Sequence, residues 1–589
     1  MERRKDPVLK KIVLLCSVAA LVAIYCFSAY SELSQLPTNL SVNEEEARSI
    51  MESRALRLVA PSEDEGIPDL KINGIAPLYD AETSTFYYSL SDDSRRWPSL
   101  HFTLNGEEVD GQLAFLEDFM SESRETVLAE STRIPFILYD DETYRQYYLT
   151  FSTLPLMQIT LDEFPEDKTV VSTLEETEEE PEWLALDYDE LLSPDAPIGR
   201  EDSFAHIRLL DPKGDEHGYG TEFTSDARIH VRGRSSVQYP KNSYRLELLI
   251  PDENDPSLLI ENKAELLGMR NDGDWVLNGM YAESTKIREK LSAEVWRNIR
   301  ADQNDPGLSP GYSVEYVEVF IGNRYWGVYG LSERIDEKQL GLEEGDRLYW
   351  SVADQGAPSS AFYQVESLYC KGYELRYPET VESSDLWEPF RQLVYLSKEA
   401  GYEERDEYWS ALADEESAAD YLLYILAVAG VDNVIQNTYF VYRADTGQFT
   451  FLPWDMDQTF GNAWQGSLPL LTGEDYTQYG AFRDEWWVTN NLLKKGGAGF
   501  NSLLQTRYRE LRRGALSEDT LLSIVDDCER QLDASGVLYR EQERWPEGAQ
   551  DTNTSPLKGY IRSRMKEMDR YVKTLPTDKE DFDAQNLLQ

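Results

Sequence analysis

Short alternating runs of apolar and polar residues fill the first part of the chain. Between residues 66 and 162, runs such as STFYYSL and RIPFILYDD are rich in aromatic and β-branched residues and end at turn residues. Closely spaced short strands of this kind are typical of a β-sandwich. The pattern therefore predicts a small all-β, sandwich-like domain over residues 66–162.

Three β-hairpins are predicted beyond that segment, because apolar and polar residues alternate on both sides of a turn. The first is the stretch ARIHVRGRSSVQYPKNSYRLELLI. The second, VEVFIGNRYWGVYGLSERID, turns at Gly322-Asn323. The third, TYFVYRADTGQFTFLPWD, turns at Asp445-Thr446-Gly447.

Helical spacing marks several other segments. The stretch STKIREKLSAEVWRNIR has a candidate N-cap in Ser284 or Thr285. ESAADYLLYILAVAGV predicts an apolar helix, and residues from about 486 to 574 are mostly amphipathic helix. Because strands precede helices along the chain, the order predicts an α+β fold.

An uncharged apolar run at residues 12–30 follows a Lys- and Arg-rich start. The run is long enough to cross a bilayer once as a helix. The positive-inside rule then leaves the C-terminal region extracytoplasmic. We therefore predict a single-pass membrane anchor; a cleaved signal peptide is the alternative, although the run is long for one.

The other predicted segments are a cytoplasmic basic tail at 1–11, a stalk at 31–65, an acidic linker at 163–184, a mixed domain at 185–575 and a polar tail at 576–589.

Charge and residue counts exclude several classes of function. The formal net charge of −52 argues against nucleic acid as a partner, because such a surface needs clustered Lys and Arg. The four histidines lack metal-ligand spacing, which argues against a zinc hydrolase. Outside the apolar run the sequence has two cysteines, Cys370 and Cys528. They could form a disulfide or be two buried thiols, and the sequence fits both.

Carboxylates and amides gather around the third hairpin. Asp432 lies in the loop after the apolar helix, and Asn437 begins the first strand. Asp455 and Asp457 follow the second strand, so the hairpin should place Asn437 beside Asp455 with Asp432 one loop away. On an extended chain Asp455 and Asp457 would face the same way. Oxygen ligands of this kind suit Mg²⁺, Mn²⁺ or Ca²⁺.

The spacing D-x4-N followed by a later Asp is also that of protein kinases. Under this interpretation Asp432 receives the hydroxyl proton, while Asn437 and Asp455 bind metal. The structural alternative is that Asp455 caps a turn and Asp432 caps a helix. Three basic residues are candidates for binding nucleotide phosphates, although each could instead be an ordinary surface charge: Lys241, Arg232 and Arg288.

At these residues the sequence resembles the CotH family of spore-coat-type atypical protein kinases. The resemblance rests on five ordered stretches between residues 155 and 575: VRGRSSVQYPKNSYRLEL, WVLNGMYAESTKIREKLS, VEVFIGNRYWGVYGLSERID, DNVIQNTYFVY and LPWDMDQTFG. It implies an atypical protein-kinase-like fold and transfer of phosphate from ATP to Ser of protein substrates, with Mg²⁺ or Mn²⁺. Asp432 matches the catalytic Asp, and Asn437 and Asp455 match metal-binding positions. Asp457 and Lys241 match other motif positions.

Two classes of function follow. One is a membrane-anchored kinase whose partner is a protein substrate with an exposed Ser. The other is a cell-surface adhesion or scaffold protein on the same fold, with the acidic cluster kept for Ca²⁺ or for structure. The presence of Asp432, Asn437 and Asp455 favours the enzyme.

Overall fold

The computed structural model describes residues 44–52, 57–61, 66–91, 94–109, 112–171, 191–193, 195–301, 311–353, 356–380, 383, 385–434, 436–462, 497–548 and 552–578. In these ranges no helix has both the length and the hydropathy needed to cross a bilayer. The predicted anchor at 12–30 lies outside them and stays a prediction. The predicted basic tail, and much of the predicted stalk, acidic linker and polar tail, lie outside them as well.

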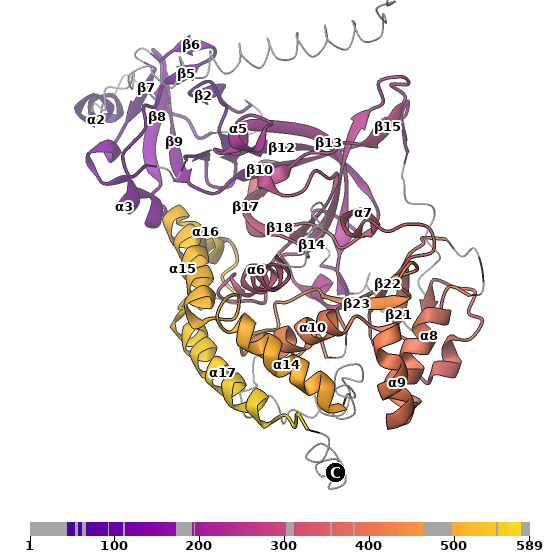
Figure 1. Cartoon of the computed structure of the whole chain (residues 1–589). Helices are drawn as coiled ribbons and strands as arrows, with labels where there is room; N and C mark the ends of the chain where they lie inside the picture. Colours follow the sequence, from indigo (N-terminus) through magenta and orange to yellow (C-terminus); the bar gives the residue numbers. More distant parts are fainter. Residues whose placement is uncertain are drawn as a thin grey trace, which may run out of the picture.

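The β-rich N-terminal segment folds into two small sheets that share one apolar core (Figure 1). The larger sheet has the order β3-β4-β9-β8-β7 with β1 beside β9, and the smaller has the order β2-β5-β6. Their strands are β1 (Arg57–Leu58), β2 (Leu70–Ile72), β3 (Leu78–Asp80), β4 (Thr85–Ser89), β5 (Phe102–Leu104), β6 (Glu107–Glu108), β7 (Leu113–Phe115), β8 (Ile134–Tyr139) and β9 (Thr143–Ser152). The helices of this unit are α2 (Glu44–Glu52), η2 (Phe119–Ser121) and α3 (Arg124–Ala129).

A nine-stranded sheet follows, in the order β11-β15-β14-β13-β12-β10-β17-β18-β16. Its strands are β10 (Leu156–Asp162), β11 (Thr169–Val170), β12 (Ser203–Leu210), β13 (Glu222–Arg232), β14 (Ser243–Pro251), β15 (Leu258–Glu261), β16 (Asp274–Asn278), β17 (Val314–Ile321) and β18 (Arg324–Ser332). The predicted boundary at residue 162 needs correction, because β10 pairs with β12 and β17 in the middle of this sheet. The small N-terminal unit therefore ends near Ser152.

The alternation along β13 explains how this sheet divides into an apolar and a polar face. Ala227, Ile229 and Val231 are buried in one core, while Arg228 and Arg232 alternate with them on the other face. The first two predicted hairpins are confirmed as the antiparallel pairs β13–β14 and β17–β18. In the second pair the turn residue Gly322 has φ 58°, a backbone conformation that glycine adopts readily.

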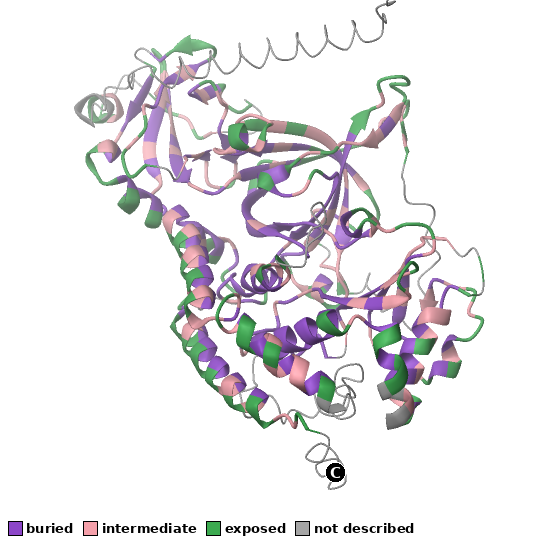
Figure 2. Cartoon of the chain, in the orientation of Figure 1, coloured by how far each residue is buried: buried purple, intermediate pink, exposed green. Residues whose placement is uncertain are grey.

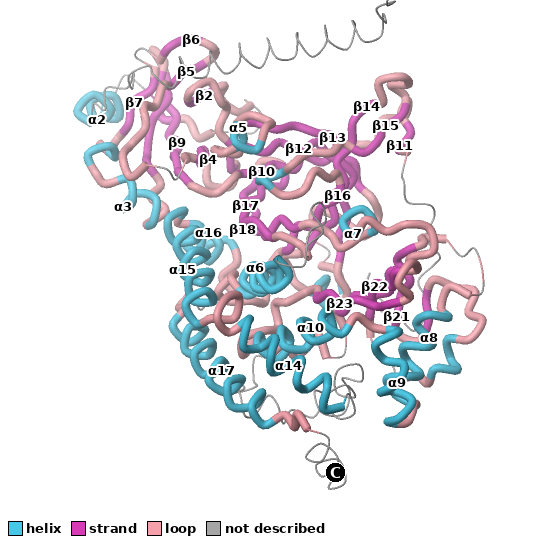
Figure 3. The backbone as a smooth tube through the Cα atoms, in the orientation of Figure 1, coloured by secondary structure: helices cyan, strands magenta, loops and turns pink. Residues whose placement is uncertain are grey.

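A five-stranded sheet in the order β20-β21-β19-β22-β23 lies next to the helical part of the chain (Figure 3). Its strands are β19 (Arg347–Ser351), β20 (Tyr369–Cys370), β21 (Tyr373–Tyr377), β22 (Thr438–Arg443) and β23 (Gln448–Pro453). The third predicted hairpin is confirmed as β22–β23. Cys370 and Cys528 are both buried free thiols, so the disulfide alternative was wrong.

The helices pack on these sheets and on one another. They are α5 (Gly214–His217), η3 (Ser235–Gln238), η4 (Leu266–Gly268), α6 (Arg288–Arg300), α7 (Glu337–Leu340), η6 (Ser359–Phe362), α8 (Glu388–Val394), η7 (Tyr395–Glu399), α9 (Tyr402–Leu412), α10 (Glu415–Val428), α14 (Gly497–Leu511), α15 (Glu518–Ser535), α16 (Val537–Arg544) and α17 (Ser555–Thr574). Figure 2 shows α10 almost wholly buried, whereas α15 and α17 have one exposed side. The described residues combine β-sheets with helices, which confirms the predicted mixed α and β content, although α6 precedes β17 and α10 precedes β22 in the chain.

The predicted N-cap of α6 is wrong. The helix begins at Arg288, and the carboxylate of Glu283 accepts hydrogen bonds from the backbone N–H of Ile287 at 2.8 Å and of Arg288 at 3.4 Å. Glu283 also accepts from the Thr285 hydroxyl at 2.7 Å. A carboxylate placed before the helix therefore satisfies the free N–H groups that a Ser or Thr cap would otherwise take.

Candidate active site

The loop between α10 and β22 positions Asp432. Helix α10 ends at Val428, and the φ of 55° at the following Ala429 turns the chain out of the helix. The half-buried carboxylate of Asp432 accepts hydrogen bonds from Gln436 Nε2 at 2.7 and 2.9 Å. It also accepts from Asn437 Nδ2 at 2.6 Å. Two side-chain amides thus fix the orientation of this carboxylate.

The β22–β23 hairpin brings Asn437 next to Asp455, as the sequence predicted. Trp454 N–H donates to Asn437 O at 3.0 Å, and Asn437 Nδ2 lies 3.5 Å from Asp455 Oδ2. Asn437 and Asp455 have φ values of 59° and 57°, in the left-handed region. Asn and Asp tolerate this region better than other side chains with a Cβ, and strained backbone of this kind often occurs at functional sites.

The buried side chain of Asn433 holds the loop to the hairpin, and sequence reasoning missed it. Its Nδ2 donates to Asn437 O at 3.1 Å and to Trp454 O at 2.9 Å. Both carbonyls belong to residues that directly flank the hairpin ladder, Asn437 before β22 and Trp454 after β23. Asn433 therefore fixes the distance between the Asp432 loop and the end of β23.

The expectation for Asp457 requires a correction. The left-handed backbone at Asp455 ends the extended conformation, so the strand geometry that would align Asp455 with Asp457 does not apply. The two carboxylates still interact, because burial and the charges of Asp455 and Glu289 raise the pKa of Asp457 well above its usual range. Gln458 Nε2 donates to Asp457 at 3.0 Å.

Glu289, in the first turn of α6, is a fourth carboxylate of this cluster and was not predicted. Its Oε2 accepts from Met456 N–H at 2.7 Å, between Asp455 and Asp457 in the chain. Its Oε1 accepts from the Tyr312 hydroxyl, also at 2.7 Å. An acidic residue in the first turn of a helix is ordinary, so nothing in its sequence context marks Glu289 as special.

Mutual repulsion and burial raise the pKa values of this acidic cluster. Burial, together with the charge of Asp455, raises the pKa of Asp432 to about 6 and that of Glu289 to about 7. Burial also raises the pKa of Asp455, although the nearby guanidinium of Arg232 opposes the shift. The cluster therefore has more negative charge than its surroundings compensate, and a cation bound there would remove the imbalance.

The oxygen atoms of this cluster suit a cation that is also bound by a ligand. They do not form a metal site built from protein side chains alone. Within the described ranges, no three carboxylate, imidazole or thiol side chains lie close enough together to hold a metal ion. Mg²⁺ usually keeps several waters and is bound by one or two carboxylates together with substrate phosphates. Asp455 and the amide of Asn437 are oxygen donors of that kind. The residues therefore fit Mg²⁺ or Mn²⁺ bound together with a phosphate ligand.

Arg232 is the predicted basic residue that reaches this cluster. It ends β13, its guanidinium lies 5.7 Å from the ring centre of Trp454, and its charge acts on Asp455. With the described part of the chain, this guanidinium makes no hydrogen bond or ion pair within 4.0 Å. A cation that interacts with the acidic cluster while keeping its donors available suits a phosphate group.

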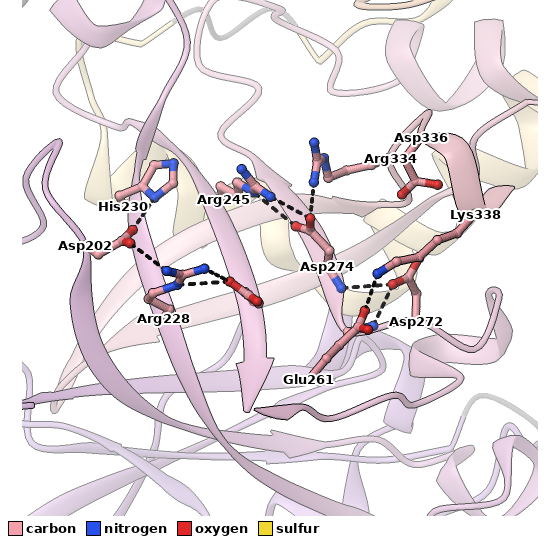
Figure 4. Close-up of polar contacts among 12 residues, drawn as sticks. Asp202, Arg228, His230, Arg245, Glu261, Asp272, Asp274, Arg334, Asp336 and Lys338 are labelled. Carbon is pink, nitrogen blue, oxygen red and sulfur yellow. Dashed lines mark hydrogen bonds and ion pairs between the residues drawn. The ribbon is translucent and has the colours of Figure 1, made fainter. Parts of the chain in front are cut away.

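Ion pairs and hydrogen bonds join neighbouring strands on the face of the large sheet that carries Arg228 and Arg245 (Figure 4). On β13, Arg228 pairs with Glu247 of β14, and His230 Nδ1 lies 2.7 Å from Asp202. On β14, Arg245 Nη2 lies 2.7 Å from Asp274 of β16, which also pairs with Arg334. Cross-strand pairs of this kind fix the strand register. The register in turn fixes where β13 ends and thus where Arg232 lies.

The two other predicted basic residues contact different partners. Arg288 pairs with Glu283 at the start of α6. Lys241 Nζ is fully buried and donates to Glu541 of α16 at 2.6 Å. No hydrogen bond or ion pair among the described residues joins either one to Asp432, Asp455 or Asp457, and their role in nucleotide binding stays a prediction.

The candidate site follows the order expected of a kinase-like protein. Helix α10 is followed by a loop that ends at Asn437, then by the β22–β23 hairpin and by Asp455. The sequence model described as CotH kinase protein matches residues 229–568, more than half of the chain. The chain therefore belongs to the CotH kinase family, as the resemblance predicted. A search of curated proteins found no match to this chain.

Proposed function

We propose that this protein transfers the γ-phosphoryl group of ATP to serine hydroxyls of protein substrates. The observation that carries this proposal is the contact of Asn437 with both Asp432 and Asp455 in a chain of the CotH kinase family. In kinases the first Asp receives the hydroxyl proton, while the Asn and the second Asp bind metal.

Asp432 is the proton acceptor in this proposal. As the serine oxygen bonds to the γ-phosphorus, the bond from that phosphorus to the bridging oxygen of ADP breaks, and the serine proton passes to the Asp432 carboxylate. A base is most effective when its pKa lies near the working pH, and burial raises the pKa of Asp432 to about 6. Its hydrogen bonds with Gln436 and Asn437 keep the carboxylate in one orientation.

Asp455 and Asn437 would hold Mg²⁺ or Mn²⁺, which neutralises charge on the transferred phosphate when it is bound. Asp457 lies within the electrostatic reach of Asp455 and adds negative charge to the same region. Arg232, whose charge acts on Asp455, would contact phosphate oxygens. Glu289 keeps the backbone between the two aspartates in place through Met456 N–H.

Titration of ATP into the purified protein, with and without Mg²⁺ or Mn²⁺, tests this proposal. We expect binding that depends on the divalent ion and on Asp455. Binding of Ca²⁺ with no nucleotide binding under any condition would instead support a surface adhesion or scaffold protein on a kinase-like fold.

We also propose that residues 12–30 anchor the protein in a membrane, with the kinase-like domain outside the cytoplasm. The basic start and the apolar run support this orientation. Protease added to intact cells should degrade the domain. Full protection in cells whose integrity is verified would contradict the orientation, and a mature N-terminus near Ser31 would indicate signal cleavage.

A further inference from the structure

The two oxygens of the Asp432 carboxylate have different partners. Oδ1 accepts a hydrogen bond from Gln436 Nε2 at 2.7 Å. Oδ2 accepts two, from Gln436 Nε2 at 2.9 Å and from Asn437 Nδ2 at 2.6 Å. Among the described residues, Gln436 is therefore the side chain that covers both oxygens, and the hydrogen bonding of Oδ1 depends on it.

The backbone of this loop brings the Gln436 amide to the carboxylate. Gln436 N–H donates to Asp432 O at 3.0 Å, which closes the loop between the two residues. Both residues are half-buried. The amide and the carboxylate therefore meet at a place that solvent and a bound substrate can still reach.

Asn437 is fixed in place by its own backbone. Its N–H donates to Ser351 O of β19 at 2.8 Å. Its carbonyl accepts from Trp454 N–H at 3.0 Å and from Asn433 Nδ2 at 3.1 Å. Because these contacts do not involve the Gln436 side chain, Asn437 can hold Oδ2 of the carboxylate whether or not Gln436 stays in contact with it.

The side chain of Gln436 is less firmly held than that of Asn437. Within the described ranges its amide makes hydrogen bonds with Asp432 and with no other residue. Rotation of this side chain would break those bonds, while Asn437 would keep the carboxylate oriented through Oδ2. Oδ1 would then be open to another donor.

A general base needs an available oxygen when the hydroxyl arrives. In the proposed reaction the serine hydroxyl donates to Asp432 as its oxygen attacks the γ-phosphorus. A carboxylate that already accepts from two amides is a weaker acceptor for a further hydroxyl, because those hydrogen bonds stabilise its charged form. The Gln436 amide and the reacting hydroxyl therefore compete for Oδ1.

We propose that Gln436 is a positioning residue that keeps Asp432 from activating water, and that the serine of a bound protein substrate displaces it. This inference rests on the proposed function and adds to it the choice of phosphate acceptor. Breaking the hydrogen bonds of Gln436 costs free energy, which a protein substrate offsets with the binding of the rest of its chain. A water molecule has no such contacts, so Gln436 favours protein hydroxyls over water.

The reaction that Gln436 suppresses is hydrolysis of ATP. In this reaction a water oxygen bonds to the γ-phosphorus, the bond from that phosphorus to the bridging oxygen of ADP breaks, and one water proton passes to Asp432. The products are ADP and inorganic phosphate. The same base and the same bound nucleotide serve hydrolysis and protein phosphorylation, so the two reactions differ in which hydroxyl reaches Oδ1.

Release of inorganic phosphate from ATP with Mg²⁺, in the absence of an acceptor protein, tests this inference. The full-length protein in detergent is compared with Gln436→Ala and Gln448→Ala. Gln448 is the matched control, because it is also half-buried and its Nε2 donates to Ser410 O at 2.8 Å, at the turn end of the β22–β23 hairpin. We expect release to rise by about tenfold or more in Gln436→Ala, the scale of a hydrogen bond to a charged group, and to stay unchanged in Gln448→Ala.

The direction of the change separates this role from simple orientation of the base. If Gln436 did no more than orient Asp432, its loss would lower phosphate release. Affinity for ATP with Mg²⁺ should stay at the wild-type value, since the proposed metal and phosphate ligands are retained. A folded Gln436→Ala protein that releases phosphate no faster than the wild type, or that loses ATP binding, would overturn the inference alone.

A double variant shows whether the rise depends on the Asp432 carboxylate. Asp432→Asn with Gln436→Ala should release phosphate no faster than Asp432→Asn alone, since the effects of residues that act as one unit do not add. A rise that persists in the double variant would also contradict the inference.

A second substitution covers the case in which Gln436→Ala does not fold. Gln436→Met has a similar length but no N–H, so it is measured in place of the alanine variant with the same expectation. Absence of metal-dependent ATP binding by the wild type would overturn the proposed function, and this inference with it.

Discussion

The side-chain amide of Asn437 donates to Asp432 at 2.6 Å and lies 3.5 Å from Asp455. One neutral side chain therefore touches the carboxylate proposed as base and the carboxylate proposed as metal ligand. The contact is possible because Asn437 ends the loop and starts the hairpin, with its backbone in the left-handed region. Substitutions at this position should consequently change both the metal-dependent chemistry and the local backbone.

Asn437→Ala and Asn437→Gly should separate these two effects. Both remove the amide, so both should weaken ATP binding in the presence of Mg²⁺. Alanine in the left-handed region adds a backbone cost of about 1–2 kcal/mol, whereas glycine adopts φ 59° without it. Thermal unfolding should therefore show a lower Tm for Ala than for Gly. Unchanged metal-dependent ATP binding in the Gly variant would exclude a role for the amide.

Glu289→Gln should retain most activity, whereas Glu289→Ala should lose it. A glutamine can still accept from Met456 N–H and can donate to the Tyr312 hydroxyl, so both contacts survive. Alanine leaves a buried donor without an acceptor, at a cost of about 1–3 kcal/mol. Kinase assays and thermal unfolding of both variants check this. Equal loss of metal affinity in Gln and Ala would instead make Glu289 a direct metal ligand.

The stability of the metal-free protein should fall as the pH rises from about 5 to 8. Asp432 and Glu289 have pKa values raised to about 6 and about 7, above those of unfolded carboxyls near 4. In this window the folded state binds more protons than the unfolded state, so raising the pH disfavours folding.

Mg²⁺ should stabilise the protein more at pH 8 than at pH 5, because it binds the deprotonated carboxylates. Unfolding temperatures with and without Mg²⁺ across this range check both statements. Glu289→Gln is the control, since it lacks one of the carboxyls whose pKa is raised and should show a shallower metal-free slope. A slope identical to that of the wild type would contradict the assignment of Glu289.

A chain that begins at Glu182 should not fold, whereas one that begins at Thr153 should. The first lacks β10, which pairs with β12 on one side and β17 on the other. The second keeps β10 but loses the stacking of Tyr87 on Tyr325, with ring centres 5.3 Å apart, and should unfold at a lower temperature than the full chain. Circular dichroism melts distinguish them. Cooperative unfolding and ATP binding by the shorter chain would show that β10 is dispensable.

Local patterns predicted the part of the site that one hairpin builds. The turn at Asp445-Thr446-Gly447 fixes the register of β22 and β23, and this register alone places Asn437 beside Asp455. The alternation along the first two hairpins likewise identified their strands. These contacts join residues close in the chain, so spacing is enough to find them.

The contacts that sequence reasoning missed join distant segments. Glu289 reaches Met456 across 167 positions, and Glu541 reaches Lys241 across 300 positions. The sequence pattern also places β10 in the N-terminal unit, because its partner β17 comes much later in the chain. Spacing carries no information about such pairs. At Asp455 a local rule failed for another reason: the left-handed backbone interrupts the alternation that an extended chain would have.

A paired comparison of Asp432→Asn and Asp455→Asn tests the central claim most directly. ATP affinity in the presence of Mg²⁺ and transfer of labelled phosphate to serine-containing protein are measured for both variants and the wild type. Asp432→Asn should bind ATP like the wild type while transfer falls by about 10²–10⁴-fold, the usual contribution of a general base. Asp455→Asn should lose metal-dependent ATP binding and transfer together. Equal loss of thermal stability in both variants, with no metal-dependent ATP binding by the wild type, would contradict the account.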